Sequence, residues 1–298
     1  MRFVLLINFL FLYISFSEAI ANEKAQPKAL TYGNKPIEAY CIAKILGGTD
    51  DDRVDLRQCY KEIIKEKIER QPVNTDVPSG FQGYDYKKEY CCESMYWQYL
   101  GSPWLNHFLI YSFYSGGGSG NFTSISMLKR EGDILIKERV LDDGDRAMGG
   151  ISEPILNASK LTYYKSISMQ DFFLLGLHHL GNEWESYKRD EKESINSLPF
   201  CAACSFAEVG YLIDFSAQNP EAKMINVILP QNDESFQEKD QQEEVEEKSL
   251  QECILSVVQQ YNAAGMNQMT QDQFKEFTQN VISVFSKNAS KSNIAVQQ

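Results

Sequence analysis

The densest polar cluster in the middle of the chain is the acidic segment 141–146, with sequence LDDGDR, which Gly149 and Gly150 follow. Its carboxylates and arginine could bind a carboxylate or a partner's backbone, and a converging carboxylate pair could serve hydrolysis, with or without a metal. The same residues could instead form an ordered turn with no binding or catalytic role, in which the carboxylates accept hydrogen bonds from nearby N–H groups. We favour the turn and keep as candidate binding residues Asp142, Asp143, Asp145 and Arg146.

Seven cysteines could bind metal, exchange electrons or form disulfides. Cys201 and Cys204 form a C-x-x-C pair that lies late in the chain, whereas a thioredoxin-like dithiol follows an early strand. A zinc site would need a second such pair, and adjacent histidines such as those at 178 and 179 rarely reach one ion together. We therefore predict structural disulfides and no metal. Cys41 with Cys59 is the best single pairing; Cys201 and Cys204 pair with each other or with Cys91, Cys92 or Cys253, and one thiol is left over.

The three histidines limit nucleophilic catalysis, because a Ser-His or Cys-His pair needs one of them as its base. His107 lies in an aromatic run, and His178 and His179 end a predicted helix, where a cationic imidazole is favourable without a catalytic role. A phosphate-binding loop precedes a helix, whereas the glycine-rich segment 116–120 precedes a strand pattern. The segment also lacks the last glycine of the Gly-x-Ser-x-Gly nucleophile elbow. We predict a hairpin turn there and no cofactor.

Helical spacing over residues 37–46 and 55–69 predicts an N-terminal helical hairpin, and the Pro-, Gly- and Asp-rich residues 71–83 predict a loop. Short aromatic and β-branched runs then predict strands over 107–114, 121–129, 133–141, 151–156, 161–166, 209–215 and 224–229. Ser168, with Asp171 three residues later, resembles a capping box and opens one helix among these strands. Strands at such close spacing predict an antiparallel β-meander, curled into a sandwich or half barrel.

The last part of the chain begins with an acidic linker, because residues 231–249 hold eight acids and two lysines. Apolar residues at helical spacing from Leu250 to Tyr261 and from Phe274 to Phe285 then predict a second helical hairpin. The expected fold is therefore α+β. Its predicted units are 22–83 (helical hairpin and loop), 84–230 (β-domain), 231–249 (linker) and 250–298 (C-terminal hairpin).

Part of the central region resembles a family of uncharacterised exported bacterial proteins, in which a Gly-rich turn precedes two strands and a Gly-Asp-Arg-x-x-Gly-Gly segment. The resemblance extends from Gly116 to Ser168. The matching residues are Gly116 to Gly120, Gly144-Asp145-Arg146 and Gly149-Gly150. Members of that family carry Cys two residues after the Asp, where this chain has Ala147, a departure that could explain the odd number of cysteines. The resemblance implies no activity.

Residues 1–21 have the pattern of a cleavable secretory signal peptide. Arg2 supplies the positive start, residues 3–16 form a mainly apolar run too short to span a bilayer, and Ala19-Ile20-Ala21 fits a signal-peptidase site before Asn22. An uncleaved anchor would need a longer apolar core. We therefore expect an exported protein, soluble after cleavage, located in a periplasm or outside the cell.

The net charge of −12 disfavours nucleic acid and anionic membranes as partners, because their binding depends on Lys and Arg. The leading hypothesis is an exported, non-enzymatic binding protein whose ligand is a protein, with an envelope inhibitor or a host-facing factor as examples. Two other classes stay open. One is an exported hydrolase that uses Asp142, Asp143 or Asp145. The other is a structural envelope protein that assembles through its C-terminal helices.

Overall fold

The computed structural model describes residues 30–46, 52–66, 82–88, 91–115, 120–181, 184–201, 204–230 and 249–295. Several sequence predictions fall outside this described part: the leader 1–21, residues 71–81 of the loop, residues 116–119 of the glycine-rich segment and residues 231–248 of the acidic linker. Among the helices in the described ranges, none is long and apolar enough to cross a membrane.

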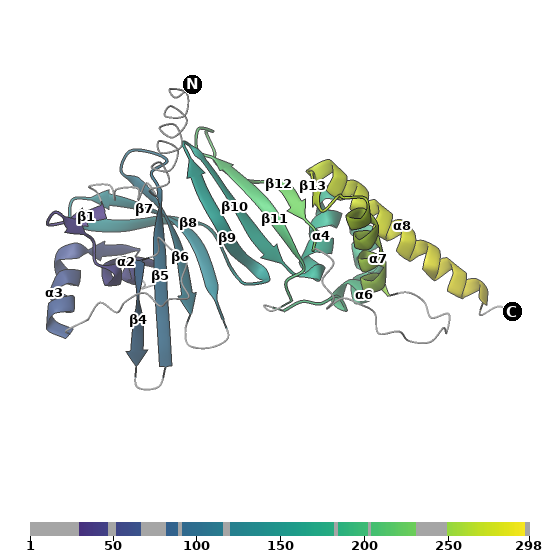
Figure 1. Cartoon of the computed structure of the whole chain (residues 1–298), viewed down its shortest axis with the longest axis horizontal. Helices are drawn as coiled ribbons and strands as arrows, with labels where there is room; N and C mark the ends of the chain where they lie inside the picture. Colours follow the sequence, from purple (N-terminus) through teal and green to yellow (C-terminus); the bar gives the residue numbers. More distant parts are fainter. Residues whose placement is uncertain are drawn as a thin grey trace, which may run out of the picture.

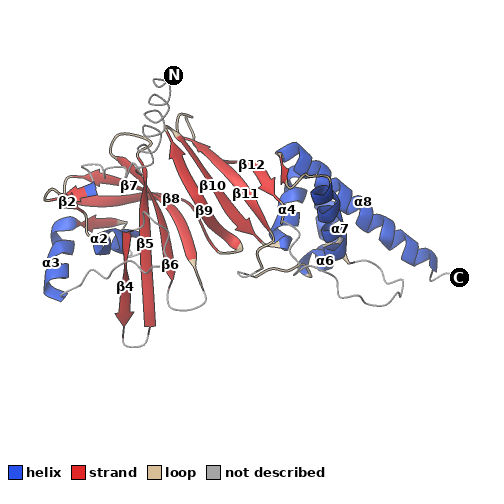
Figure 2. Ribbon diagram, viewed as in Figure 1, coloured by secondary structure: helices blue, strands red, loops and turns tan. Residues whose placement is uncertain are grey.

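One antiparallel sheet runs through the described chain (Figures 1 and 2). From β5 to β12 each strand pairs with the strand before it in sequence, so the sheet is the predicted meander, and its path does not close into a barrel. Its strands are β4 (Gln82–Lys88), β5 (Cys91–Gly101), β6 (His107–Ser115), β7 (Phe122–Glu131), β8 (Ile134–Asp145), β9 (Met148–Asn157), β10 (Lys160–Ile167), β11 (Ala207–Asp214) and β12 (Ala222–Ile228).

Four short strands complete the pairing. β3 (Arg53–Asp55) pairs with β8, and β13 (Gln268–Met269) pairs with the end of β12. β1 (Thr31–Tyr32) and β2 (Lys35–Pro36) form a separate two-stranded sheet.

The sheet folds back on itself at the β8–β9 hairpin, where the two strands pair only through Asp145 and Met148. Beyond this point one face of β6 and β7 packs against β9, β10 and β11. The cluster between these two layers includes Leu109, Tyr111, Ile125, Met127, Ile151, Leu156, Leu161, Tyr163, Ile213 and Phe215. The Tyr111 hydroxyl donates to the Ile151 carbonyl at 2.6 Å and links the layers directly.

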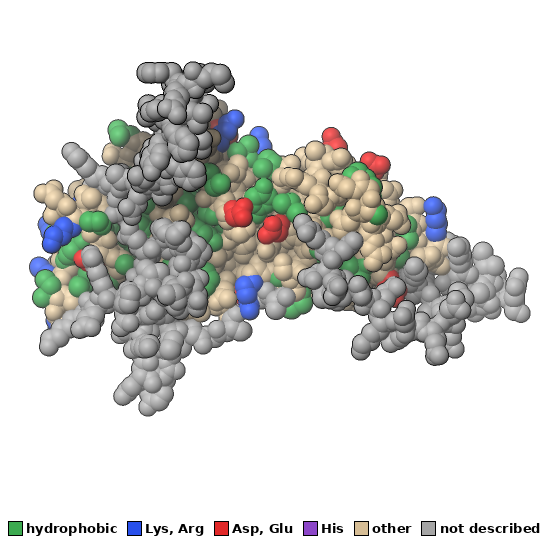
Figure 3. Space-filling view, in the orientation of Figure 1, with side chains coloured by type: hydrophobic (Ala, Val, Ile, Leu, Met, Phe, Trp, Pro, Cys, Tyr) green, Lys and Arg blue, Asp and Glu red, His purple; other side chains and the backbone are tan. Residues whose placement is uncertain are grey.

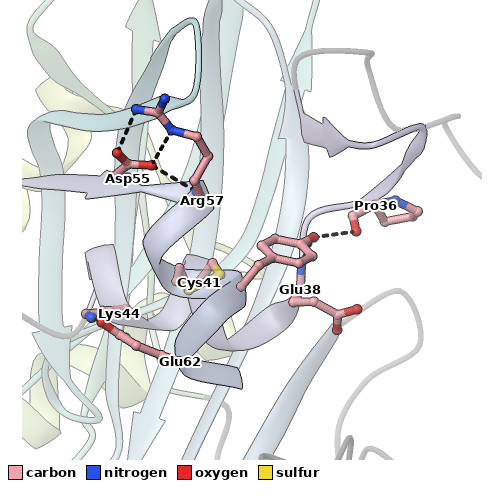
Figure 4. The surroundings of a disulfide bond; sticks show 9 residues. Pro36, Glu38, Cys41, Lys44, Asp55, Arg57 and Glu62 are labelled. Carbon is pink, nitrogen blue, oxygen red and sulfur yellow. Dashed lines mark hydrogen bonds and ion pairs between the residues drawn. A yellow bond between two sulfur atoms is a disulfide. The ribbon is translucent and has the colours of Figure 1, made fainter. Parts of the chain in front are cut away.

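The N-terminal helices α2 (Ala39–Leu46) and α3 (Leu56–Glu66) cover the other face of β5–β8. Side chains alternate along a strand, so Phe108 and Ile110 face these helices while Leu109 faces the opposite layer. The disulfide between Cys41 and Cys59 joins the two helices, as predicted, and both cysteines are buried. Figure 4 shows this bridge, with the Lys44–Glu62 ion pair between the two helices and the pair of Asp55, at the end of β3, with Arg57 on α3.

A second group of helices lies at the far end of the sheet in Figure 1. Here α4 (Met169–Leu180), α7 (Leu250–Ala263) and α8 (Gln271–Ala295) share a core with β11 and β12, and the short α5 (Glu185–Asp190) and α6 (Lys192–Asn196) lie between α4 and β11 in sequence. The predicted C-terminal hairpin therefore packs within its own chain.

Helices α4, α7 and α8 each begin at a side-chain cap, and the cap predicted at Ser168 is confirmed. Ser168 accepts a hydrogen bond from the Asp171 amide, and Thr270 forms a reciprocal capping box with Gln273. Ser249 and Glu252 form a further reciprocal box at the start of α7.

The structure corrects the sequence prediction at several places. The loop prediction was wrong for Gln82 and Gly83, which are in β4 and pair with Trp97 and Tyr96. The sequence patterns also missed β4, β5, α5 and α6. Pairing with a neighbouring strand overrides local propensity in β4, and α5 and α6 are too short to show helical periodicity.

Candidate functional site

Asp142 lies on β8 and faces the interior between the two sheet layers. Its carboxylate accepts hydrogen bonds from the Tyr163 hydroxyl at 2.8 Å and from the Lys165 ammonium at 2.5 Å. The Asp143 amide adds a third donor at 2.9 Å. Each of the two carboxylate oxygens therefore accepts at least one hydrogen bond, and Asp142 links β8 to β10.

Tyr163 and Tyr211 stand opposite each other on β10 and β11, with ring centroids 5.6 Å apart. Burial raises the pKa of the Tyr163 hydroxyl well above its usual range, and the Asp142 charge raises it further. Burial, with the same carboxylate, also raises the pKa of Tyr211. Both phenols are protonated at neutral pH and act as hydrogen-bond donors or packing groups, not as bases.

Asp145 and Arg146 form the tip of the β8–β9 hairpin. The Asp145 carboxylate accepts a hydrogen bond from the Asn121 backbone N–H at 2.9 Å, and the Arg146 Nε donates to the same oxygen at 3.1 Å. The Asn121 hydrogen bond, followed by the Arg146 side chain, lowers the pKa of Asp145. The carboxylate therefore fixes the start of β7 against the hairpin, which is the ordered-turn role favoured from the sequence.

The glycines around this hairpin permit close backbone contact. A Cβ atom on Gly150 would lie 2.5 Å from the Arg146 carbonyl oxygen, and one on Gly144 would overlap the Gly149 carbonyl group. Gly149 and Arg146 both have positive φ, at 88° and 44°. Close backbone contacts at Gly144 and Gly150 and the positive φ of Gly149 thus explain each glycine of the Gly-Asp-Arg-x-x-Gly-Gly segment.

The face of the hairpin that points away from Asp142 carries exposed apolar side chains. Tyr114 pairs with Phe122, Phe122 with Asp145, and Asp145 with Met148. Directly paired residues in antiparallel strands share a face, so these four side chains form one row across β6, β7, β8 and β9. Phe122 is 48% exposed and Met148 is 43% exposed.

We call this row, together with the exposed Asp143 two residues before Asp145 on β8, the hairpin surface. It lies on the sheet face that α2 and α3 cover further along the strands, because Phe122 alternates in phase with Leu128, a residue of the α2–α3 core. Figure 3 shows that hydrophobic and acidic side chains also adjoin on the visible face, over the middle of the sheet. Apolar side chains beside carboxylates can bind a partner through contact area and charge.

The predicted site residues are therefore divided between two environments. Asp142 bonds to Lys165 and Tyr163 on one face, whereas Asp143 and Asp145 belong to the hairpin surface on the other. Within the described ranges, no group of three or more His, Cys, Asp or Glu side chains is arranged to hold a metal ion. The acidic segment does not bring its three carboxylates together in the way that the hydrolase hypothesis requires.

The remaining candidates have local partners. The His107 Nε2 atom lies 3.1 Å from the Glu138 carboxylate, and its other ring nitrogen contacts the Leu105 carbonyl. His179 contacts Gln271 at 2.9 Å, and burial lowers its pKa. Cys201 and Cys204 form a disulfide with each other. Cys253 is buried near Asn288 and belongs to neither bridge, and the side chains of Cys91 and Cys92 lie outside the described part.

Sequence reasoning missed Phe122, Met148, Tyr163 and Lys165. Phe122 and Met148 could have been found by looking, in each predicted strand, for apolar residues on the face opposite to the predicted core.

Comparison of the chain with protein-family models, with curated proteins and with solved structures gave no match.

Proposed function

We propose that this chain is an exported, non-enzymatic protein whose hairpin surface binds another protein. The observation that carries the proposal is the pair of exposed apolar side chains Phe122 and Met148, which share one row across four strands with the half-buried Tyr114 and Asp145, beside the exposed Asp143. Large apolar side chains gathered on one exposed face are a common mark of protein interfaces. The two disulfides support an oxidising compartment, and we assign the mature protein to a periplasm or the extracellular space.

Charge suggests the kind of partner. Residues 142–298 hold 24 acidic and 12 basic residues, so this half carries the whole net charge of −12. The hairpin surface lies at the border of this half, with Asp143 exposed at its edge. A protein with an apolar contact residue surrounded by Lys and Arg would complement it.

The test begins with a photo-reactive phenylalanine analogue at position 122 and, separately, at position 148, in protein produced and exported by its natural source. We expect one protein to be cross-linked from both positions. The matched control is Ile64 on α3, which is exposed but lies away from the hairpin. Absence of a shared adduct, or the same adduct from position 64, would contradict the proposal.

Binding of the purified partner then provides the second measurement. We expect Phe122→Asp to weaken its affinity at least tenfold, because central aromatic residues dominate interface energies, while Ile64→Asp leaves the affinity unchanged. Circular dichroism of both variants checks that they fold. Equal affinities for the two folded variants would rule out the hairpin surface as the binding site.

A further inference from the structure

The sequence contains three Asn-x-Ser/Thr triplets, at Asn121-Phe122-Thr123, Asn157-Ala158-Ser159 and Asn288-Ala289-Ser290. This triplet is the acceptor signal for N-linked glycosylation of exported chains when it lies in an accessible surface segment. The structure distinguishes the three sites by their surroundings.

Asn157 is the last residue of β9 and begins the turn to β10. Asn157 and Ala158 are exposed, and Ala158 has a φ of 52°, which places it in the left-handed region typical of tight turns. The backbone leaves the sheet here, because Asn157 and Lys160 form the last pair between the two strands. A large group on the Asn157 side chain would project into solvent without disturbing a neighbouring strand.

The other two triplets are less favourable. The Thr123 side chain is buried and accepts a hydrogen bond from the Ile151 amide at 2.6 Å, so the triplet at Asn121 runs into the sheet. Asn288 lies within α8, and its side-chain amide contacts the Cys253 sulfur at 3.6 Å. A sugar on that amide would compete with the contact.

An exposed apolar turn lies beside the Asn157 triplet. The Ser159 carbonyl accepts a hydrogen bond from the Phe215 amide at 2.8 Å, and the Phe215 carbonyl accepts one from the Trp104 indole at 3.2 Å. Trp104 is 38% exposed, and its neighbour Leu105 is 88% exposed. A glycan attached to Asn157 would therefore stand next to this β5–β6 turn and shield it.

We propose that Asn157 is an N-glycan acceptor, an inference that rests on the proposed export. The donor would be a lipid-linked oligosaccharide diphosphate, used by a membrane oligosaccharyltransferase. The Asn157 Nδ2 forms a bond to C1 of the first sugar, and the bond from C1 to the diphosphate oxygen breaks. The lipid diphosphate leaves with that electron pair and, in the overall balance, takes up the proton that the amide loses.

The test is secretion of the full chain, with its own leader, from cultured mammalian cells. Protein from the medium is treated with peptide N-glycosidase in ¹⁸O water, which converts a glycosylated Asn to labelled Asp. We expect the label at Asn157 in peptide mass spectra and faster gel migration after treatment. Asn157→Gln and Ser159→Ala should each remove the label at this site, and Ser159→Thr should retain it.

Two outcomes would overturn the inference. Secreted protein with an unlabelled Asn157 would refute the acceptor site while leaving export intact, and the second acceptor-site variant guards against a folding defect in the first. Protein that stays inside the cells with its leader attached would refute export and, with it, the acceptor site.

Discussion

Lys165 and Asp142 form an ion pair whose side chains are only 19% and 20% exposed. The pair lies between two layers of the folded sheet, so each charge has lost most of its contact with water. Removal of one partner leaves the other charge without compensation in a poorly hydrated place. The Tyr163 hydroxyl makes the arrangement a three-residue network that joins β8 to β10.

We expect Lys165→Met to lower the free energy of unfolding by about 1–3 kcal/mol, because the half-buried Asp142 carboxylate loses its charged hydrogen-bond donor. Urea unfolding monitored by fluorescence measures the change. The matched control is Lys160→Met on the same strand. The Lys160 side chain is 60% exposed and its ammonium nitrogen is 4.0 Å from the Asp214 carboxylate, so this substitution should change stability by less than about 0.5 kcal/mol. Equal effects of the two substitutions would show that the Asp142 network contributes little.

The sequence identifies Asp142 as a candidate but not its partners. The acidic segment is conspicuous because its charges are adjacent, whereas Tyr163 and Lys165 follow 21 and 23 residues later on another strand. Register shifts within the β7–β8 and β9–β10 pairs decide which residues meet. Such shifts depend on tertiary packing and leave no local signal.

At the scale of the elements, the helix starts were predictable because a capping box is a local pattern. Seven strands could be predicted from alternating aromatic and β-branched residues, although most boundaries differ by one or more residues. The sequence predicts a curled meander, but the place at which the sheet folds over, the β8–β9 hairpin, could not be predicted. It depends on contacts such as that between Tyr111 and Ile151, which are 40 residues apart.

The two disulfides should differ in their contribution to stability. The Cys41–Cys59 bridge closes a sequence separation of 18 between two buried cysteines, so we expect replacement of both by Ala to cost about 3 kcal/mol. The Cys201–Cys204 bridge closes a separation of 3, and its double Ala variant should lose about 2 kcal/mol or less. Chemical unfolding of both variants tests the order. A larger loss for the second variant would contradict the chain-entropy argument.

At the scale of the whole molecule, charge is unevenly distributed along the sequence. Residues 1–141 carry equal numbers of acidic and basic residues, whereas residues 142–298 carry the full excess of acids. A field of this kind attracts cationic partners and is screened by salt.

Binding of the cross-linked partner should therefore weaken as salt is raised, over the range in which the Debye length falls from about 30 Å to about 3 Å. Isothermal titration at several NaCl concentrations measures this slope. Asp143→Asn should reduce the slope because Asp143 lies on the hairpin surface, while Asp272→Asn, at the start of α8, should leave it nearly unchanged. An affinity indifferent to salt would remove the electrostatic argument but leave the apolar contact of Phe122.

The meander has a consequence for how the chain is made. Because every strand from β5 to β12 pairs with the strand that precedes it, a chain that leaves a translocation channel N-terminus first can add each new strand to one already outside. Among the described strands of this sheet, only the short β3 pairs with a strand that is not its neighbour in chain order, β8. Among the described strands, no long strand therefore stays unpaired until a distant partner strand is exported. This limits the exposed strand edges through which newly exported chains aggregate.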